Sequence, residues 1–584
     1  MGTDFMTRLW SYMIRYRGRY ALGIGCLIAT GSLAMLVPYL LKTAVDSIAS
    51  GEAVSSVAWL ALAIILIAIV QGTVRTLSRF LIFNVGRDIE FDLRNDLFSH
   101  LERLPLAYYQ EQQTGDLMSR LVNDITAVRL LLGIGLLNMI NTPIYYIYGV
   151  TIMVSIDWRL TVASLLTYPL ALAFVKRSSR QLMERTLKVQ EGLAAMSSRV
   201  QESLSGIHVL QAYAREEAEI ETFRTMNREF SAQNMALARV RGTIMPVMRG
   251  VSSFGTLVVL WYGGLRVISG ALSLGDLVAF IGYLHLLAWP TMALGWMLSI
   301  VQRGRAALIR LEAVFAVEPA IDDRRALPNG TDLRGEVAFH RVDFGYNGAT
   351  NGARVLSDVS FTLPAGGTLG IVGRTGSGKT SIVDLIPRLY DPTAGVVTID
   401  GRDLREIPVG VLRRSIGFVP QDPFLFSRTV RENIRFGAPG ADEEAIKRAA
   451  ETAGLDRDLD ELLRGYDTIV GERGITLSGG QKQRVTLARA LIVDPTILIL
   501  DDALSSVDTE TERRILGRLR GMMHERTSIL IAHRISTVME ADLILVVDEG
   551  RIIEVGDHPS LLERGGFYAD LFQRQRLTEE LDAL

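Results

Sequence analysis

Six long runs without a charged side chain dominate the first half of this sequence. The first, from Tyr20 to Leu41, is 22 residues long, and a helix of that length crosses the roughly 30 Å hydrocarbon core of a bilayer. This length, and the runs that follow, favour a retained membrane helix over a cleaved signal peptide. We therefore expect a multi-pass integral membrane protein with six spanning helices, at about 20–41, 53–75, 130–156, 159–178, 244–266 and 276–302.

The distribution of arginine predicts how these helices are oriented. The segment before the first span and the long connections after the second and fourth spans are rich in arginine, whereas the connections Asp157–Arg159 and Arg266–Asp276 are short. Translocated loops carry few Lys and Arg. We therefore expect both termini and the soluble part of the chain on the cytosolic side, with the bacterial inner (plasma) membrane as the localisation.

The two arginine-rich connections, of about 55 and about 70 residues, contain many helix-forming residues and few Gly and Pro. We expect spans two to five to continue as helices into the cytosol, with reversals near Gln110–Gly115 and Gln211–Arg215. Within the segment 1–18, residues 5–16 place Phe5, Leu9, Trp10, Met13 and Ile14 near helical spacing beside arginines. This pattern predicts an amphipathic helix among the lipid headgroups, and an exposed leader is the alternative.

The composition changes after Arg303 and divides the chain. We expect a transmembrane domain over 19–317, a linker over 318–335 and a soluble domain over 336–584, which accounts for 48% hydrophobic and 22% charged residues in one chain. The formal net charge of −2 gives no support to nucleic acid as a partner. A single cysteine, Cys26, excludes intrachain disulfides and cysteine-based metal clusters.

The soluble part contains a phosphate-binding loop. A short buried strand is predicted at Thr368–Val372, and the G-x-x-x-x-G-K-T pattern follows it directly, at Gly373, Arg374, Thr375, Gly376, Ser377, Gly378, Lys379 and Thr380. Backbone N–H groups of such a loop surround phosphates, the Lys379 ammonium adds a positive charge, and the Thr380 hydroxyl suits Mg²⁺. A glycine-rich turn before an ordinary helix is the alternative, and the flanking strand and helix argue against it.

Two more motifs lie further along the chain. The apolar run Ile497–Asp501 predicts a buried strand that ends in a carboxylate suited to Mg²⁺, and Asp502 follows it. Between this run and the loop stand Leu477, Ser478, Gly479, Gly480 and Gln481, before a helix that we expect to begin near Lys482. A helix N-terminus binds phosphate. Because one phosphate site is already present, this second one indicates a phosphate presented from elsewhere.

With these motifs in this order, the chain resembles an ATP-binding cassette (ABC) exporter half-transporter of the B-type multidrug and lipid family, over nearly its whole length. The fold class implied is a multidomain membrane protein: an all-α six-helix transmembrane domain with long cytosolic helical extensions, fused to an α/β P-loop ATPase domain. The ligands implied are ATP and Mg²⁺.

The resemblance also implies roles for individual residues. Tyr346 would stack on adenine, Gln421 and His533 would act with Asp502 in catalysis, and Thr380, Gln421 and Asp501 would hold Mg²⁺. Nucleotide contacts are implied for Gly373–Thr380 with the adjoining Ser381, and for Leu477–Gln481. Asp508 would belong to a dimer-contacting loop, and Gly471–Gly474 looks like the segment that meets the coupling helices.

In this family ATP is bound between the phosphate loop of one chain and the Leu-Ser-Gly-Gly-Gln motif of another, which implies a dimer that works by alternating access. Asp502 departs from the family pattern, because the family usually has Glu as general base at this position. Shortening the carboxylate by one methylene costs on the order of 10²-fold in rate when the geometry is displaced by about 1 Å. We favour a slow site in a heterodimer with a second ABC half-transporter chain, and a homodimer is the alternative.

The sixth predicted span has one chemically distinct face, formed by His285, Trp289, Met292 and Trp296. It fits either packing against a neighbouring helix, which is slightly favoured, or a cavity wall for amphipathic molecules. We expect ATP-driven export of amphipathic small molecules, lipids or peptides. The alternatives are an importer on the exporter fold, such as one for siderophores, and a nucleotide-gated channel or sensor that transports nothing.

Overall fold

The computed structural model describes residues 3–166, 168–327, 332–346, 354–471, 474 and 476–582. The chain divides into two compact units. The helical unit comprises Met1–Glu102 and Thr114–Val317, and the sheet unit comprises Arg103–Gln113 and Glu318–Leu584. The short segment 103–113 therefore belongs to the same unit as the C-terminal part of the chain, although the helices before and after it in the sequence belong to the helical unit.

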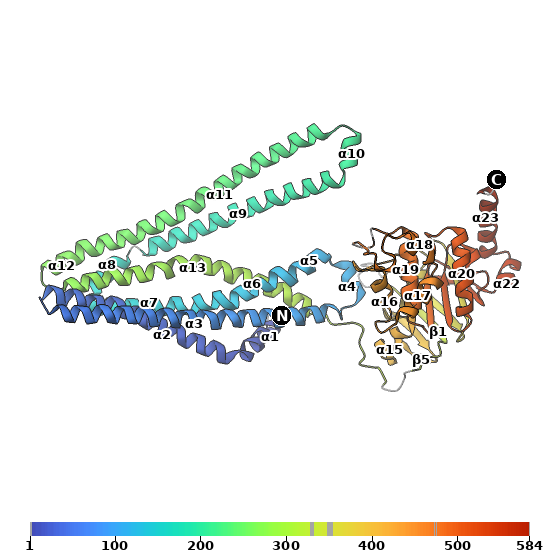
Figure 1. The fold of residues 1–584 in the computed structure, drawn as a ribbon, viewed down its shortest axis with the longest axis horizontal. Coiled ribbons are helices and arrows are strands. Elements are labelled where there is room, and N and C mark those ends of the chain that lie inside the picture. Colours follow the sequence, from blue (N-terminus) through green and yellow to red (C-terminus); the bar gives the residue numbers. More distant parts are fainter. Residues whose placement is uncertain are drawn as a thin grey trace. The chain divides into compact units, whose positions relative to one another are not determined.

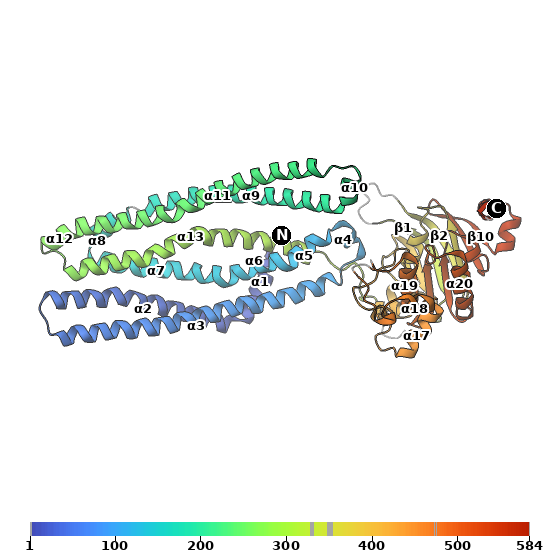
Figure 2. The ribbon, with the colours of Figure 1, turned by 45° about the horizontal axis from the view of Figure 1, so that its top comes forward.

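Long helices make up the helical unit, and α9 and α11 run side by side in both ribbon views (Figures 1 and 2). In the part of the unit that the structure describes, three π-helical turns, η1 (Arg120–Asp124), η2 (Leu131–Gly135) and η3 (Val259–Gly263), continue the adjoining helices. The helices are α1 (Thr3–Arg15), α2 (Arg17–Ala49), α3 (Val54–Leu101), α5 (Thr114–Ser119), α6 (Ile125–Leu130), α7 (Leu136–Ile156), α8 (Trp158–Leu165), α9 (Tyr168–Ser205), α10 (Ile207–Ala212), α11 (Glu216–Val258), α12 (Gly264–Ile268) and α13 (Leu274–Phe315).

Within the described residues, four helical segments are long and apolar enough to cross a membrane: Arg17–Ala49, Val54–Leu101, Thr114–Ile156 and Leu274–Phe315. The predicted span at 159–178 covers α8 and the start of α9, and the one at 244–266 covers the end of α11, η3 and the start of α12. The apolar part of this last region, Ser253–Ile268, is shorter. The fourth and fifth spans stay predictions.

A ladder of acidic residues on α3 holds the N-terminal helices. Tyr12 donates to Asp96, and the guanidinium groups of Arg15 and Arg19 bond Asp92 and Asp88 at 2.6 and 2.5 Å. The three aspartates are spaced by four residues, so they share one face of α3. This face fixes α1 and the start of α2 along α3.

The face of α13 that carries His285, Trp289 and Trp296 is exposed on this chain, with exposed fractions of 67% for Trp289 and 45% for Trp296. The side chain of Met292 lies outside the described ones. Packing against a neighbouring helix and a cavity wall both stay predictions, because these exposed fractions are those of a single chain. A cavity of about 850 Å³ between α2, α7 and α13 is lined by other residues, including Tyr39, Tyr148 and Tyr283.

Among the described residues, two sheets form the centre of the sheet unit. The four-stranded antiparallel sheet has the order β2-β1-β4-β5, and the six-stranded sheet has the order β10-β9-β3-β8-β7-β6, parallel except for β10. The strands are β1 (Val337–Phe344), β2 (Leu356–Leu363), β3 (Thr368–Gly373), β4 (Ala394–Ile399), β5 (Arg402–Asp403), β6 (Ile416–Val419), β7 (Ile497–Asp501), β8 (Thr527–Ile531), β9 (Leu543–Asp548) and β10 (Arg551–Gly556). The carboxyl ends of β3, β7 and β8 meet at one edge, where ligands bind in parallel sheets.

Helices of the sheet unit surround these strands (Figure 2). Their apolar faces and those of the strands form two buried clusters, one on each side of β3 and β7. The helices are α4 (Leu106–Glu111), α14 (Lys379–Leu385), α15 (Val409–Arg414), α16 (Val430–Arg435), α17 (Glu443–Thr452), α18 (Asp456–Glu461), α19 (Gly479–Leu491), α20 (Thr509–Met523), α21 (Ile535–Val538), α22 (His558–Glu563) and α23 (Phe567–Asp582).

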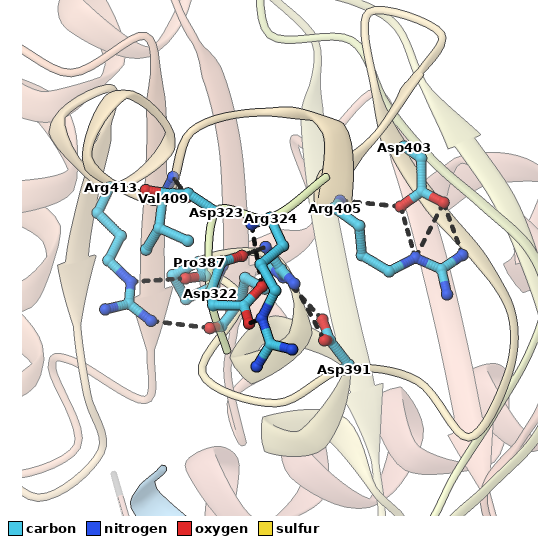
Figure 3. Close-up of polar contacts among 10 residues, drawn as sticks. Asp322, Asp323, Arg324, Pro387, Asp391, Asp403, Arg405, Val409 and Arg413 are labelled. Atoms are coloured by element: carbon cyan, nitrogen blue, oxygen red, sulfur yellow. Dashed lines mark hydrogen bonds and ion pairs between the residues drawn. The ribbon is translucent and has the colours of Figure 1, made fainter. Parts of the chain in front are cut away.

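The predicted linker is attached to the sheet unit by polar contacts (Figure 3). Asp323 accepts a 2.8 Å hydrogen bond from the backbone N–H of Val409, and the buried Arg388 donates to the carbonyl of Asp322 at 3.1 Å while it pairs with Asp391 at 2.8 Å. The first half of the linker is therefore fixed on this unit. Residues 328–331 lie outside the described ones.

Candidate functional site

The loop between β3 and α14 curls tightly because its glycines adopt conformations closed to other residues. Gly373 has φ +153°, and a Cβ there would lie 2.0 Å from the carbonyl oxygen of Val547. Gly378 has φ +99°, in the region that favours glycine. The buried Lys379 ammonium donates to the carbonyls of Gly373 and Arg374 at 3.0 and 2.8 Å, and burial lowers the pKa of this lysine.

A cavity of about 290 Å³ opens above this loop and gathers groups from distant parts of the sequence. The phosphate-loop residues, the two adjacent aspartates, Gln421, His533 and Tyr346 all contribute to it. The lining residues are Tyr346, Val355, Thr375, Gly376, Ser377, Gly378, Lys379, Thr380, Ser381, Gln421, Asp501, Asp502, Ile531 and His533. Its residues suit a nucleotide whose phosphates lie on the loop.

Asp501 ends β7 and is 1% exposed. The Thr380 hydroxyl bonds this carboxylate, yet its buried Oδ2 atom has no hydrogen-bond partner among the described residues. Burial, and next the charge of Asp502, raise the pKa of Asp501. The Asp501 Oδ2 atom lies in the same site as the Thr380 hydroxyl, and the exposed Gln421 amide lines the same cavity. These oxygen donors fit Mg²⁺, which binds few protein ligands.

Asp502 and His533 face the same cavity. The carboxylate of Asp502 accepts hydrogen bonds from the side chain of Ser505 and the backbone N–H of His533, and its Oδ2 lies 4.0 Å from His533 Nε2. Burial raises the pKa of Asp502, and the nearby His533 opposes that rise. The backbone at Asp502 is left-handed, with φ +48°, a region in which Asp is better tolerated than most side chains.

Tyr346 stands at the rim of the cavity, just beyond β1. Its hydroxyl lies 3.0 Å from Ser381 Oγ, and its ring meets Phe344 and Tyr390 edge to face at centroid distances of 5.0 and 5.2 Å. These contacts fix the ring, which is suited to stack on a flat base.

The Leu-Ser-Gly-Gly-Gln segment forms the start of α19. The helix begins at Gly479, so the expected start near Lys482 is wrong by three residues. The reason is a capping box, in which Ser478 Oγ accepts from the N–H of Gln481 and Gln481 Oε1 accepts from the N–H of Ser478. Leu477 is buried, and a Cβ on Gly480 would lie 3.1 Å from the carbonyl of Ser506.

The start of α19 is not part of the 290 Å³ cavity. Ser478 and Gly479 are exposed, and none of Leu477–Gln481 is among the residues that line that cavity. Asp508, also outside it, is the exposed N-cap of α20, where it accepts from the N–H of Thr511 at 2.9 Å. Of the predicted segment Gly471–Gly474, Glu472 and Arg473 lie outside the described residues.

Two groups beside the cavity, Asp384 and Tyr390, are not among the residues predicted from the sequence. Asp384, on α14, has its pKa raised from 3.8 to about 6, by burial and then by the charge of Asp501. In the sequence, Asp384 is a single acidic residue among the apolar residues that follow the phosphate loop, and this pattern could have identified it. The second group is Tyr390, whose hydroxyl accepts a 2.9 Å hydrogen bond from Gln110 on α4, and no local pattern pairs residues 280 positions apart.

Comparisons with known proteins agree with this geometry. Residues 20–291 match the family model described as the ABC transporter transmembrane region, and residues 356–505 match the ABC transporter model. In the solved structures, the chain is similar to a bacterial Atm1-family ABC exporter with ATP bound, with a TM-score of 0.78 and 29% identity over 95% of this chain and 98% of that one.

Curated relatives extend over the whole chain. The chain is 36% identical to the multidrug resistance-like ATP-binding protein MdlA of Escherichia coli, over 98% of this chain and 97% of the relative. It is 36% identical to YheI of Bacillus subtilis, described as a probable multidrug resistance ABC transporter ATP-binding/permease protein, over 98% of both chains. It is 32% identical to the ATP-dependent lipid A-core flippase of Syntrophus aciditrophicus, over 98% of this chain and 94% of the relative.

Proposed function

This chain belongs to the ABC exporters with fused transmembrane and ATPase domains, and we propose that it is one half of a dimer that uses ATP to export an amphipathic molecule across a bacterial inner membrane. The helical unit contains apolar helices for the membrane, and the sheet unit is the ABC ATPase domain. Both termini and the ATPase domain lie in the cytosol in this proposal, because the long arginine-rich connections lie on that side.

The dimer is proposed because two phosphate-binding features of the chain, the cavity at Lys379 and the start of α19, are separate. The cavity at Lys379 has the loop, the carboxylates and His533, whereas Ser478 and Gly479 stand exposed at the start of α19, outside that cavity. Both sets of groups are needed to enclose ATP in this family. In a dimer, the α19 N-terminus of one chain would complete the cavity of the other.

Each group around the cavity then has a chemical task. Tyr346 stacks on the adenine, and Lys379 with the loop N–H groups neutralises the phosphates. Asp501, Thr380 and Gln421 would hold Mg²⁺, which when bound offsets the charge of the phosphate oxygens. Asp502 polarises the attacking water, and His533 donates to the terminal phosphate and fixes its orientation.

Asp502 is the residue that makes this site slow. Its carboxylate is already held by Ser505 and by the backbone of His533, and it is one methylene shorter than the Glu usual in the family. Because the Asp502 carboxylate is short and is bonded to Ser505 and to the backbone of His533, it reaches less far towards an attacking water. This supports a heterodimer in which a second ABC half-transporter chain contributes the faster site, using Ser478–Gln481 of this chain.

Two classes of cargo are supported by the relatives. Relatives named for multidrug resistance and for lipid A-core flipping indicate amphipathic small molecules or lipids, and peptides share the same amphipathic character. The cavity of about 850 Å³ in the helical unit combines Tyr39, Tyr148 and Tyr283 with the Lys42–Asp276 ion pair. Aromatic and charged groups around one space suit such cargo.

Phosphate release from the purified chain alone tests the slow-site proposal. We expect slow hydrolysis, because a dimer of this chain contains two short carboxylates, and we expect Asp502→Glu to accelerate it. ATP occupancy measured separately controls for loss of binding. Brisk hydrolysis by the unmodified chain, abolished by Asp502→Asn, would show that Asp502 suffices as the base and would favour a homodimer.

A further inference from the structure

The loop that carries His533 is held by hydrogen bonds from the C-terminal helix. This His533 loop, residues 532–534, joins β8 to α21. Gln575, on α23, donates from Nε2 to the carbonyl of His533 at 2.6 Å and accepts at Oε1 from the backbone N–H of Ile535 at 2.8 Å. One amide therefore bonds the backbone on both sides of Arg534, and both bonds together fix the orientation of that amide.

A second side chain holds the same loop from α20. Glu512, 5% exposed, accepts a hydrogen bond from Arg534 at 2.5 Å and one from the Thr537 hydroxyl at 2.7 Å. These contacts fix the side chain next to His533 and the helix that follows. They leave the carbonyl of His533 itself to Gln575.

The loop borders a cavity of about 130 Å³, which is lined by Asp502, His533 and Arg534 among others. Where packing leaves a gap, the position of a loop depends on its hydrogen bonds. The position of the His533 loop therefore depends on the two hydrogen bonds of Gln575.

The helix that carries Gln575 is itself firmly placed. Glu554 accepts from the N–H groups of Phe567 and Tyr568 at the start of α23, at 2.6 and 3.2 Å. The side chain of Tyr568 is fully buried. Gln575 follows Tyr568 by two helical turns, so it lies on the face of α23 that is docked on the domain.

We propose that Gln575 is a positioning residue for hydrolysis, which holds the backbone of His533 so that the imidazole and Asp502 face the terminal phosphate together. The inference rests on the role proposed above for His533. His533 also donates its backbone N–H to the Asp502 carboxylate, so a shift of this loop displaces both groups at once. Phosphate binding by the Lys379 loop does not depend on this contact.

The test is a comparison of kcat and KM for ATP in the full-length chain, reconstituted in nanodiscs, with steady-state phosphate release as the readout. Gln575→Ala removes both hydrogen bonds, and Gln575→Met removes them while it keeps the length and packing of the side chain. Gln573→Ala is the matched control, because Gln573 is an exposed glutamine on the same helix. His533→Ala, alone and combined with Gln575→Ala, completes a double-mutant cycle.

We expect both Gln575 variants to lower kcat by about tenfold to about a hundredfold with KM within about twofold of the unmodified value, since a loop misplaced by about 1 Å loses catalytic geometry. We expect only a smaller further loss when Gln575→Ala is added to His533→Ala, because the imidazole is already absent and only the displacement of Asp502 remains. Unchanged kcat, an equal loss in the His533→Ala background, or a loss confined to KM would overturn the proposal. Unchanged kcat in His533→Ala alone would overturn the site assignment itself.

Discussion

Replacing Asp384 with asparagine should stabilise the nucleotide-free ATPase domain at neutral pH. Burial and the neighbouring Asp501 raise the pKa of Asp384 from 3.8 to about 6, so the folded state favours its protonated form. This contribution to stability is present below about pH 4 and is lost as the pH rises through 6. Asparagine has the shape of the protonated acid and no charge to desolvate.

The size of the effect follows from the pKa. A rise from 3.8 to about 6 corresponds to roughly 3 kcal/mol at pH 7.5, and partial exposure of the side chain reduces this to about 2 kcal/mol. At pH 5 the Asp384 carboxyl is ionised in the unfolded state and mostly protonated in the folded state. About half of the destabilisation expected at pH 7.5 is therefore already present at pH 5. Asp384→Asn should therefore stabilise the domain about twice as much at pH 7.5 as at pH 5.

Pulse proteolysis of the full-length chain in urea, without nucleotide or metal, measures this stability when cleavage within the ATPase domain is followed. Asp460→Asn is the control, because Asp460 is exposed and surface substitutions change stability by less than about 0.5 kcal/mol. An equal gain at both pH values, or a loss at pH 7.5, would refute the burial of an ionised carboxylate as the cause.

Two further predictions concern the nucleotide and the contact of α4. Lys379→Ala should abolish binding of a fluorescent ATP analogue, and Tyr346→Ala should weaken it with thermal unfolding unchanged; unaltered affinity in both would remove the nucleotide from this cavity. Gln110→Ala and Tyr390→Phe, which each break the 2.9 Å hydrogen bond, should lower transport into proteoliposomes more than basal ATP hydrolysis. The exposed Gln113→Ala is the control, and parallel loss of both activities would exclude α4 from coupling.

The phosphate loop and the strands at its edge could be predicted from the sequence because local patterns determine them. The apolar runs before Gly373 and up to Asp501 form β3 and β7, close to the expected bounds. The start of α19 at Gly479 is also encoded locally, since Ser478 and Gln481 have the spacing of a capping box.

Other features depend on contacts that no local pattern encodes. The hydrogen bonds of Gln110 to Tyr390 and of Gln575 to His533 join segments far apart in the sequence. The left-handed backbone at Asp502 follows from the junction of β7 with the loop after it, where the Asp502 N–H bonds the carbonyl of Ile531 at 2.9 Å.

In the proposed dimer, the α19 N-terminus of a second chain completes the ATP site. Nucleotide retained per dimer, measured on a mixture of two inactive variants, tests it most directly. Lys379→Ala removes the phosphate loop and Ser478→Arg blocks the α19 N-terminus, so neither variant alone should retain ATP. A mixed dimer should regain one intact site, with the loop from one chain and Ser478 from the other. Mixed dimers of confirmed two-chain mass that retain no ATP, or a single chain that retains it alone, would contradict the claim.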